Sequence, residues 1–430
     1  MPWLNTGVDV ALALSESVRL LPGGLMQINN RWFQLFASLI AMIMIANLQY
    51  AWTLFVQPLQ QGTGWKLSDI QYAFALFILF QTWVQPLDGW LIDRMGPRWF
   101  ISVAGLLCGF GWAGMGYATT LPMLYTMYCA AGIGAAFVYS GSIGSALKWF
   151  KERRGLASGI MAAGFGGGTA LFIPFISYAI ANRGYQAAFI STGVFQGLVI
   201  MIVAQFLRHP ARESAREVTA TARNRQQFTT LEMLKTPQFY LMYASFVMMA
   251  TGFLLATANL APIARSWGLT AAAVTLAATF SPLANGASRI FWGWASDRTG
   301  RENAMIIAFT LNAVCLLLVL SLGQLSGGWF AFSLVLVYFT GGQIYSLFPS
   351  ATGDYFGTRH ATSNYGVLYS AKGVGAFIGA WGGPLLFERF GSWDACFYGS
   401  AALALIAAVM AVGLRATVAA PRAAGVGVPA

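Results

Sequence analysis

Long apolar stretches decide what this chain of 430 residues can fold into. Stretches of about 20 apolar residues, the length that crosses the ~30 Å hydrocarbon core of a bilayer, recur along it. Because 57% of its residues are hydrophobic and only 9% are charged, the chain has too few charges to cover a soluble globule. We predict an all-α membrane protein with twelve transmembrane helices, at 33–57, 70–92, 100–118, 121–147, 155–181, 186–207, 238–262, 270–296, 303–322, 327–350, 362–387 and 393–414.

The predicted spans form two sets of six. A polar, basic linker at 208–237 separates an N-terminal half, 33–207, from a C-terminal half, 238–414, and tails are expected at 1–32 and 415–430. Of the 25 Lys and Arg residues, nineteen fall in the tails and in even-numbered loops, which the positive-inside tendency places in the cytoplasm. We therefore expect a multi-pass protein of the inner (plasma) membrane with both termini cytoplasmic.

Several other functional classes fit the sequence poorly. The pI of about 9.7 could indicate nucleic-acid binding, but the basic residues lie in short loops between apolar spans and so indicate topology. The four cysteines stand singly in apolar segments, and the two histidines, His209 and His360, are far apart. This pattern predicts no disulfide framework, metal site, cofactor or catalytic nucleophile–base pair.

A charged turn occurs twice, once in each half. "GWLIDRMGPR" begins at Gly89 and "GWASDRTGR" at Gly293, so that Asp93 and Asp297 are 204 residues apart. Each turn lies between the second and third spans of its half, as expected for duplicated halves related by an axis along the membrane normal. The turns could be topological anchors only, but that explains their Arg residues and not the repeated Asp.

An Asp at a membrane edge can accept hydrogen bonds from a helix N-terminus, and an Arg can pair with carboxylates or with carbonyls at a helix C-terminus. We predict that the two turns latch the halves together as a cytoplasmic gate. The predicted gate residues are Asp93, Arg94, Arg98, Asp297, Arg298 and Arg301.

The two turns resemble the signature of the major facilitator superfamily. The matching residues are Gly89, Asp93, Arg94, Gly96 and Arg98, and then Gly293, Asp297, Arg298, Gly300 and Arg301. This resemblance covers nearly the whole chain, and it implies a transporter built from two pseudo-symmetric six-helix halves.

Two cations are expected near the middle of the membrane. Arg289 precedes Asp297 by eight residues, which places it about 12 Å inside the edge, and Lys372 lies about 15 Å into its span. Each costs ~2.5–3.5 kcal/mol to insert, so each needs a reason. Ion pairs with buried acids are one alternative, but the acids within predicted spans, Asp88 and Asp394, lie close to span ends. We therefore predict a central site that binds small carboxylate anions, preferably a dianion.

Other polar or aromatic residues at similar depth are candidates for the wall of this site. They are Gln49, Tyr50, Gln81, Gln85, Tyr139, Phe165, Gln343, Tyr345 and Tyr369. In the repeat, Gln85 corresponds to Arg289 and Phe165 to Lys372, so the first half is neutral where the second is positive. A single buried Gln or Tyr can equally be structural. Tyr139 and Tyr369 are the best placed of the candidates.

A narrower resemblance concerns the same residues. "NGASRIFWGWASDRTGR", "LFPS" at 347–350 and "NYG" followed by "AK" at 371–372 resemble the oxalate:formate antiporter family. The resemblance implies that Arg289 and Lys372 hold a dicarboxylate. In that family, Trp stands at the positions of Gly341 and Tyr369 of this chain, and Tyr stands at the position of Phe165. We therefore expect a wider pocket at Gly341.

Together these features predict a secondary transporter that exchanges small organic anions, an oxalate-like dicarboxylate against a carboxylate such as formate, by alternating access. A proton-coupled or facilitated monocarboxylate transporter is the main alternative, although it would normally use a buried acid or His. A membrane enzyme and a receptor fit less well, because the first lacks catalytic groups and the second leaves the midplane cations unexplained. We expect a monomer in the lipid bilayer.

Overall fold

The described chain is almost entirely helical. A computed structural model describes residues 30–150, 154–208, 227–357 and 360–423, and it contains no strand in these ranges. Most of the predicted tail 1–32, the middle of the predicted linker 208–237 and the end of the predicted tail 415–430 lie outside the described residues.

The elements of the N-terminal half are α2 (Arg31–Tyr50), α3 (Trp52–Thr63), α4 (Leu67–Trp83), α5 (Gln85–Met115), α6 (Leu121–Trp149), α7 (Arg154–Gly167), the 3-10 helix η1 (Gly168–Leu171) and α8 (Ile173–Ala204). Those of the C-terminal half are α9 (Thr230–Met233), α10 (Pro237–Ser266), α11 (Ala271–Thr299), α12 (Arg301–Leu322), α13 (Gly327–Gly341), α14 (Ile344–Phe356), α15 (Ala361–Tyr369), α16 (Ala371–Ala376), the π-helix η4 (Phe377–Trp381), α17 (Gly382–Phe390) and α18 (Asp394–Ala423). Helix α18 continues beyond residue 414, where the last span was predicted to end.

Two glycines reverse the chain inside what are otherwise continuous helices. Gly96 breaks α5 with φ 74° and ψ 158°, and Gly184 breaks α8 with φ 80° and ψ 164°. Eight described stretches are long and apolar enough by themselves to cross a membrane, and one of them, Gly159–Ala204, includes the Gly184 reversal. When α5 and α8 are divided at Gly96 and Gly184, the described helices cross the bundle in alternating directions. This is the order expected for two sets of six spans.

The internal duplication is visible in the backbone. Gly300, which corresponds to Gly96 in the second charged turn, has φ 88° and ψ 153°. Gly64 and Gly268, also 204 residues apart, have φ 73° and 71°. These left-handed conformations are strained for residues with a Cβ atom, so the same turns in both halves need glycine.

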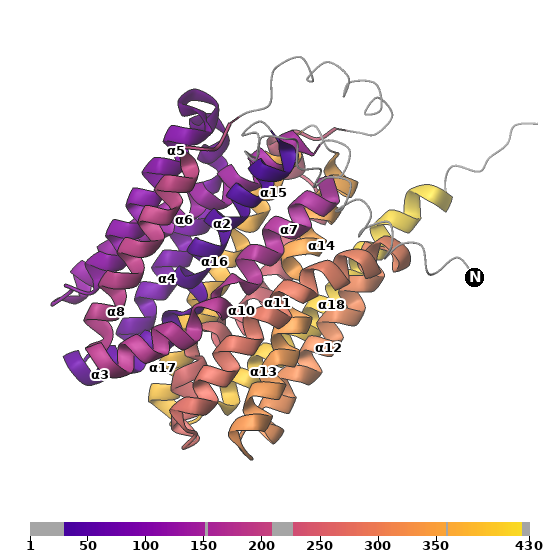
Figure 1. Cartoon of the computed structure of the whole chain (residues 1–430). Coiled ribbons are helices and arrows are strands. Elements are labelled where there is room, and N and C mark those ends of the chain that lie inside the picture. The colour runs from indigo at the N-terminus through magenta and orange to yellow at the C-terminus, as the bar shows by residue number, and fades with distance from the viewer. Residues whose placement is uncertain (1–29, 151–153, 209–226, 358–359, 424–430) are drawn as a thin grey trace, which may run out of the picture.

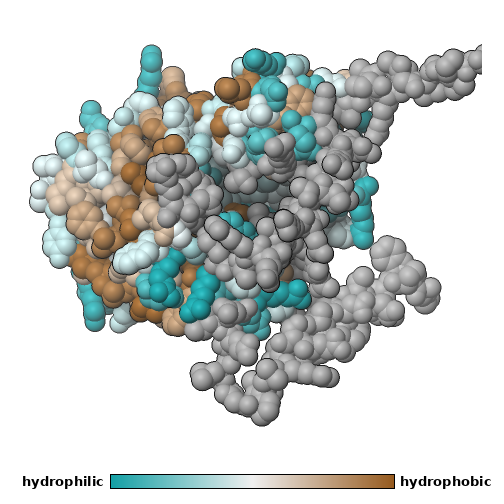
Figure 2. Space-filling view, turned by 90° about the horizontal axis from the view of Figure 1, so that it is seen from above, coloured by the Kyte–Doolittle hydropathy of each residue, from teal (hydrophilic) through white to brown (hydrophobic). Residues whose placement is uncertain are grey.

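The two halves form neighbouring bundles, drawn in indigo to magenta and in orange to yellow in Figure 1. They meet mainly where α7 packs on α11, α4 on α16 and α3 on α10. We call the end that carries the segment between α8 and α10 the linker end, and the other the distal end. Figure 2 looks onto the linker end, where hydrophilic residues project among hydrophobic ones on the uncovered part of the face.

The outer surface of the bundle is apolar. Phe110, Phe175 and Val409 are 59%, 73% and 70% exposed, and many other large hydrophobic side chains are exposed in the same way. Such a surface suits lipid rather than water as the surrounding solvent.

Helices α5 and α8 pack closely because glycines face each other across them. A Cβ atom at Gly193 would lie 2.5 Å from the backbone nitrogen of Ala113, and one at Gly197 would lie 2.8 Å from the Cα atom of Gly109. Small residues let helices approach in this way within membranes, where packing replaces the hydrophobic effect.

We expect Gly193→Val to lower the apparent melting temperature in detergent clearly, because forcing a side chain between backbones costs ~1–3 kcal/mol or more. Gly399→Val is the matched control, since Gly399 is exposed and a Cβ atom there meets nothing within 4 Å. Equal melting temperatures for the two variants would contradict the close packing of α5 and α8.

Candidate functional site

Lys372 lies on α16 at the interface of the two halves and is 0% exposed. Its Nζ atom donates hydrogen bonds to Oε1 of Gln49 at 2.9 Å, to Oε1 of Gln81 at 2.7 Å and to the hydroxyl of Tyr369 at 3.3 Å. An ammonium group has three N–H donors, so these three neutral oxygens satisfy it. Two of the three acceptors come from the other half of the molecule.

Arg289 lies on α11 and is 2% exposed. Its Nη1 atom donates to the backbone carbonyl of Ala162, on α7 of the other half, at 2.8 Å. Its Nε and Nη2 atoms are buried without a hydrogen-bond partner. These two atoms form one edge of the guanidinium group, the edge that can bind a carboxylate through two parallel hydrogen bonds.

Aromatic rings surround the two cations. The guanidinium carbon of Arg289 lies 4.6 Å from the ring centre of Tyr345 and 5.8 Å from that of Phe165. The Nζ atom of Lys372 lies 5.4 to 5.7 Å from the rings of Phe165, Tyr345 and Tyr369. Aromatic faces carry partial negative charge, so they stabilise cations while excluding water.

The remaining rings extend this wall. Tyr139 stacks on Tyr369 with centroids 5.8 Å apart and also contacts Phe165 at 5.4 Å. Tyr50 contacts Phe165 at 5.7 Å, and its hydroxyl accepts a hydrogen bond from Nδ2 of Asn285 at 2.9 Å. Tyr50 and Tyr139 therefore belong to the same aromatic shell as the rings that touch the cations.

Sequence reasoning missed Asn285, although a signal for it existed. Asn285 precedes Arg289 by four residues on α11, so the two share a helix face. It is 0% exposed, and its Oδ1 atom has no hydrogen-bond partner. A buried amide one turn from a midplane Arg was therefore a candidate for the same site.

The structure brings most of the predicted substrate residues together. Gln49, Tyr50, Tyr139, Phe165, Tyr345 and Tyr369 lie around Arg289 and Lys372 through the contacts given above. Gln85 is different, because among the described contacts it makes no hydrogen bond to either cation and its Nε2 atom has no partner. The nearby Gln81, one turn earlier, binds Lys372 instead.

The small size of Gly341 predicts a wider pocket, but the structure has no free space beside this residue. A Cβ atom there would lie 3.0 Å from Cδ2 of Phe253 and 3.3 Å from Nδ2 of Asn312. The ring of Phe253, on α10, therefore occupies the space that a side chain at position 341 would need. The expectation of extra room at this point is wrong, because residues distant in sequence fill it.

Neither cation has an acidic partner among the described residues. The salt bridges described join Arg301 to Asp297 at 2.6 Å and to Asp354 at 3.0 Å, near the linker end. Asp88 is 1% exposed, and one of its oxygens accepts a hydrogen bond from Ser140 at 2.5 Å, while Oδ1 has no partner. The two midplane charges thus face neutral oxygens and aromatic rings.

The charged turns make contacts within their own halves. Arg98 donates to the carbonyl of Gln205 at 2.9 Å, and Arg298 lies over the ring of Trp294 at 4.0 Å. Arg301 joins α12 to α11 and α14 through Asp297 and Asp354. The side chains of Asp93 and Arg94 lie outside the described residues, so the predicted latch between the halves stays a prediction.

The halves touch on both sides of the cations. Towards the linker end, Nε1 of Trp83 donates to the carbonyl of Ser370 at 3.3 Å. Towards the distal end, Nε2 of Gln71 donates to the carbonyl of Ala258 at 2.7 Å, and Oγ1 of Thr53 accepts from the amide of Ala261 at 2.8 Å. Together with the burial of both cations, these contacts make the central site enclosed in this conformation.

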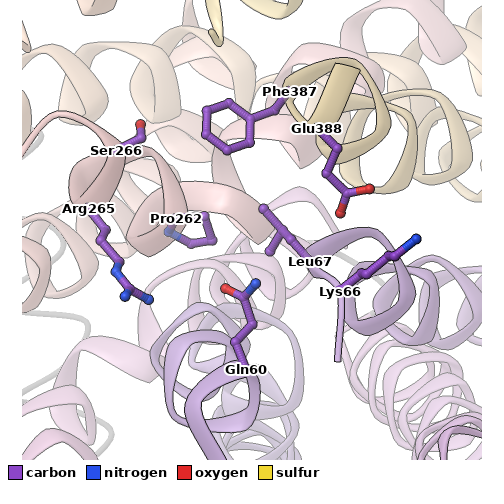
Figure 3. Close-up of a pocket in the computed structure, with 8 residues that line it drawn as sticks. All are labelled: Gln60, Lys66, Leu67, Pro262, Arg265, Ser266, Phe387 and Glu388. Atoms are coloured by element: carbon purple, nitrogen blue, oxygen red, sulfur yellow. The ribbon is translucent and has the colours of Figure 1, made fainter. Parts of the chain in front are cut away.

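A further contact between the halves involves Glu388 of α17 at the distal end. Its two carboxylate oxygens accept hydrogen bonds from the backbone amide and the hydroxyl of Ser68, at 2.8 and 2.9 Å. Ser68 is in the first turn of α4, whose amides lack partners within the helix, so Glu388 caps α4 from the opposite half. Glu388 also borders a cleft of about 670 Å³ lined by side chains from α3, α4, α10 and α17 and by Lys66 (Figure 3).

Comparisons with known proteins agree with this architecture. The family model of the major facilitator superfamily matches residues 37–261 and 241–429. The oxalate:formate antiporter of Oxalobacter formigenes is 37% identical over 385 residues, which are 89% of this chain and 91% of that protein. Monocarboxylate transporter 12 of Xenopus laevis is 25% identical over 73% of each chain.

Fold, surface and comparisons define a multi-pass membrane transporter rather than an enzyme. The chain belongs to the major facilitator superfamily. The predicted fold class, two six-helix halves of a major facilitator fold, is thereby confirmed.

The contact between Glu388 and Ser68 generates a test. We expect Glu388→Gln to speed hydrogen–deuterium exchange at the Ser68 amide by about tenfold, because a charge-assisted hydrogen bond is worth ~1.5–3 kcal/mol. Arg389→Gln is the control, since the Arg389 guanidinium lies over Phe390 of its own helix. Unchanged exchange in Glu388→Gln would mean that the carboxylate does not hold the distal end closed.

Proposed function

We propose that the protein is a secondary active transporter that exchanges small organic anions across the membrane by alternating access. One observation carries the proposal: Arg289 and Lys372 are buried between the halves and held by neutral oxygens alone among the described residues. A buried cation without a counter-charge is costly, and an anionic substrate supplies that charge.

The chemistry of the two cations suits carboxylates. The unpartnered Nε and Nη2 edge of Arg289 matches the two oxygens of one carboxylate. Lys372 is a point charge that can exchange a Gln oxygen for a second carboxylate oxygen. Both cations belong to the C-terminal half, while the N-terminal half contributes the amide oxygens and part of the aromatic wall.

The relative from Oxalobacter formigenes supports an oxalate-like dicarboxylate exchanged against a carboxylate such as formate. The proposed substrate residues are Arg289, Lys372, Gln49, Tyr50, Gln85, Tyr139, Phe165, Gly341, Tyr345 and Tyr369. Gln85 offers its unpartnered amide nitrogen, and Gly341 would act through the ring of Phe253, which lies beside it.

The membrane arrangement is part of the proposal. We propose that the linker end and both termini lie in the cytoplasm, which the basic loops support, and that the membrane is the inner (plasma) membrane. The proposed gate residues would then lie at the cytoplasmic mouth; they are Asp93, Arg94, Arg98, Asp297, Arg298 and Arg301. We propose that the carrier works as a monomer, because each copy contains both halves of the site.

One feature favours a second function, proton-coupled monocarboxylate transport. Asp88 is buried near the linker end with one unpartnered oxygen, and its neighbour Ser140 follows Tyr139 of the site. Buried carboxyl groups in membrane spans are typical of proton-coupled carriers. The similarity to monocarboxylate transporter 12 supports monocarboxylates as substrates of this second function.

The role of Arg289 is testable by substitution. We expect Arg289→Gln to abolish carboxylate binding, and Arg289→Lys to weaken it at least tenfold, because a point charge cannot form two parallel hydrogen bonds. Binding is measured by ligand-induced thermal stabilisation with oxalate. Arg415→Gln, an exposed Arg on α18, should bind normally. Near-normal affinity in Arg289→Lys would place the substrate elsewhere.

Anion exchange and proton-coupled transport predict different results in one transport experiment. Proteoliposomes preloaded with labelled oxalate should lose it slowly in carboxylate-free buffer at clamped potential and rapidly once external formate is added, since an anion neutralises the closing site. If a pH gradient instead drives net uptake without internal anion, the second function is favoured. Asp88→Asn should then abolish the effect of the gradient.

A further inference from the structure

Phe253 has a place in the fold that its sequence context does not reveal. It lies on α10, is 0% exposed, and points its ring edge at the position where a side chain of Gly341 would begin. Gly341 ends α13, in the middle of the span that α13 and α14 form together. Two residues separated by 88 positions therefore share one space in the core.

Asn312 borders the other side of the space beside Gly341. Nδ2 of Asn312, on α12, would lie 3.3 Å from a Cβ atom at Gly341. This amide donates hydrogen bonds to the carbonyl of Val337 at 3.2 Å and to the hydroxyl of Thr340 at 2.9 Å. Asn312 cannot move without breaking both, so any side chain at position 341 must displace the ring of Phe253.

The ring of Phe253 also leads to the anion site. It packs edge-on against Tyr345 with centroids 5.8 Å apart and lies 5.1 Å from Tyr338. Tyr345 in turn presents its ring to the Arg289 guanidinium at 4.6 Å. Phe253 thus packs behind the ring that lies against the Arg289 guanidinium.

We propose that Phe253 determines the size of carboxylate that the site accepts, by holding Tyr345 against Arg289 and filling the space beside Gly341. This inference rests on the proposed function and specifies its substrate class as small carboxylates. The ring of Phe253, which comes from α10, occupies the space beside Gly341 and keeps the pocket narrow. Phe253 is a positioning residue, since it acts on the substrate through Tyr345.

Removing the ring should widen the pocket. In Phe253→Ala, the space beside Gly341 becomes continuous with the vacated volume, and Tyr345 can withdraw from Arg289 into it. Each extra methylene that a pocket admits or rejects changes discrimination about 10-fold to 200-fold. We therefore expect the preference for oxalate over C4 and C5 dicarboxylates to fall at least tenfold, with oxalate exchange retained.

The experiment measures inhibition of labelled-oxalate exchange by unlabelled C2 to C5 dicarboxylates in proteoliposomes, together with thermal stabilisation by the same compounds in detergent. Phe330→Ala is the matched control, because Phe330 is also 0% exposed in the C-terminal half, and its described ring contact is with Trp267. It should lose stability but keep the preference. Phe253→Leu, which stays apolar and buried, serves if Phe253→Ala does not fold.

Exchanging the side chains at positions 341 and 253 provides a second test. Gly341→Trp alone should lose stability and exchange, because its ring collides with Phe253. The double variant Gly341→Trp with Phe253→Gly should recover folding and a preference for oxalate. An unchanged preference in folded Phe253→Ala or Phe253→Leu, with normal exchange by the unmodified protein, overturns this inference alone. Absence of carboxylate exchange by the unmodified protein overturns the proposed function as well.

Discussion

The hydrogen bonds between two buried cations of one half and neutral oxygens of the other organise the centre of this protein. Lys372 reaches Gln49 and Gln81, and Arg289 reaches the carbonyl of Ala162. Neutral dipoles reduce the cost of burying each charge without cancelling it, so the positive potential persists in a water-poor space. The same bonds join the halves, so the proposed anion site forms part of the interface between them.

The backbone follows the internal duplication, whereas the side chains at the centre depart from it. The paired glycines at 96 and 300 reproduce one turn in both halves, so the backbone keeps its symmetry. The side chains at the centre do not, since Phe165 occupies the place that corresponds to Lys372. If each half carried both cations, twice the positive charge would have to be buried. Placing both cations in one half leaves the other free to provide acceptors and aromatic rings.

The sequence predicted the features that have a local signature. Apolar length gave the spans, the repeated turn gave the duplication, and Arg289 and Lys372 were identified because charge in an apolar span is costly. Contacts between distant residues were not predictable. The acceptor of Arg289 is a backbone carbonyl, which any residue at position 162 offers. The bond from Ser68 to Glu388 joins residues 320 positions apart, and the ring of Phe253 on α10 fills the space beside Gly341 on α13.

Binding and movement are coupled in this arrangement because the cations are bonded across the interface. In the proposed alternating-access cycle, opening the site would move the halves apart around it, which would break the bonds of Arg289 to Ala162 and of Lys372 to the two glutamines. A carboxylate bound to both cations, as we propose, would replace those acceptors with charge-assisted ones of its own. It therefore interacts differently with closed and open forms, and such differential interaction is what allows a ligand to shift a conformational equilibrium. An anion that reaches Arg289 alone leaves the Lys372 bonds intact and shifts that equilibrium less.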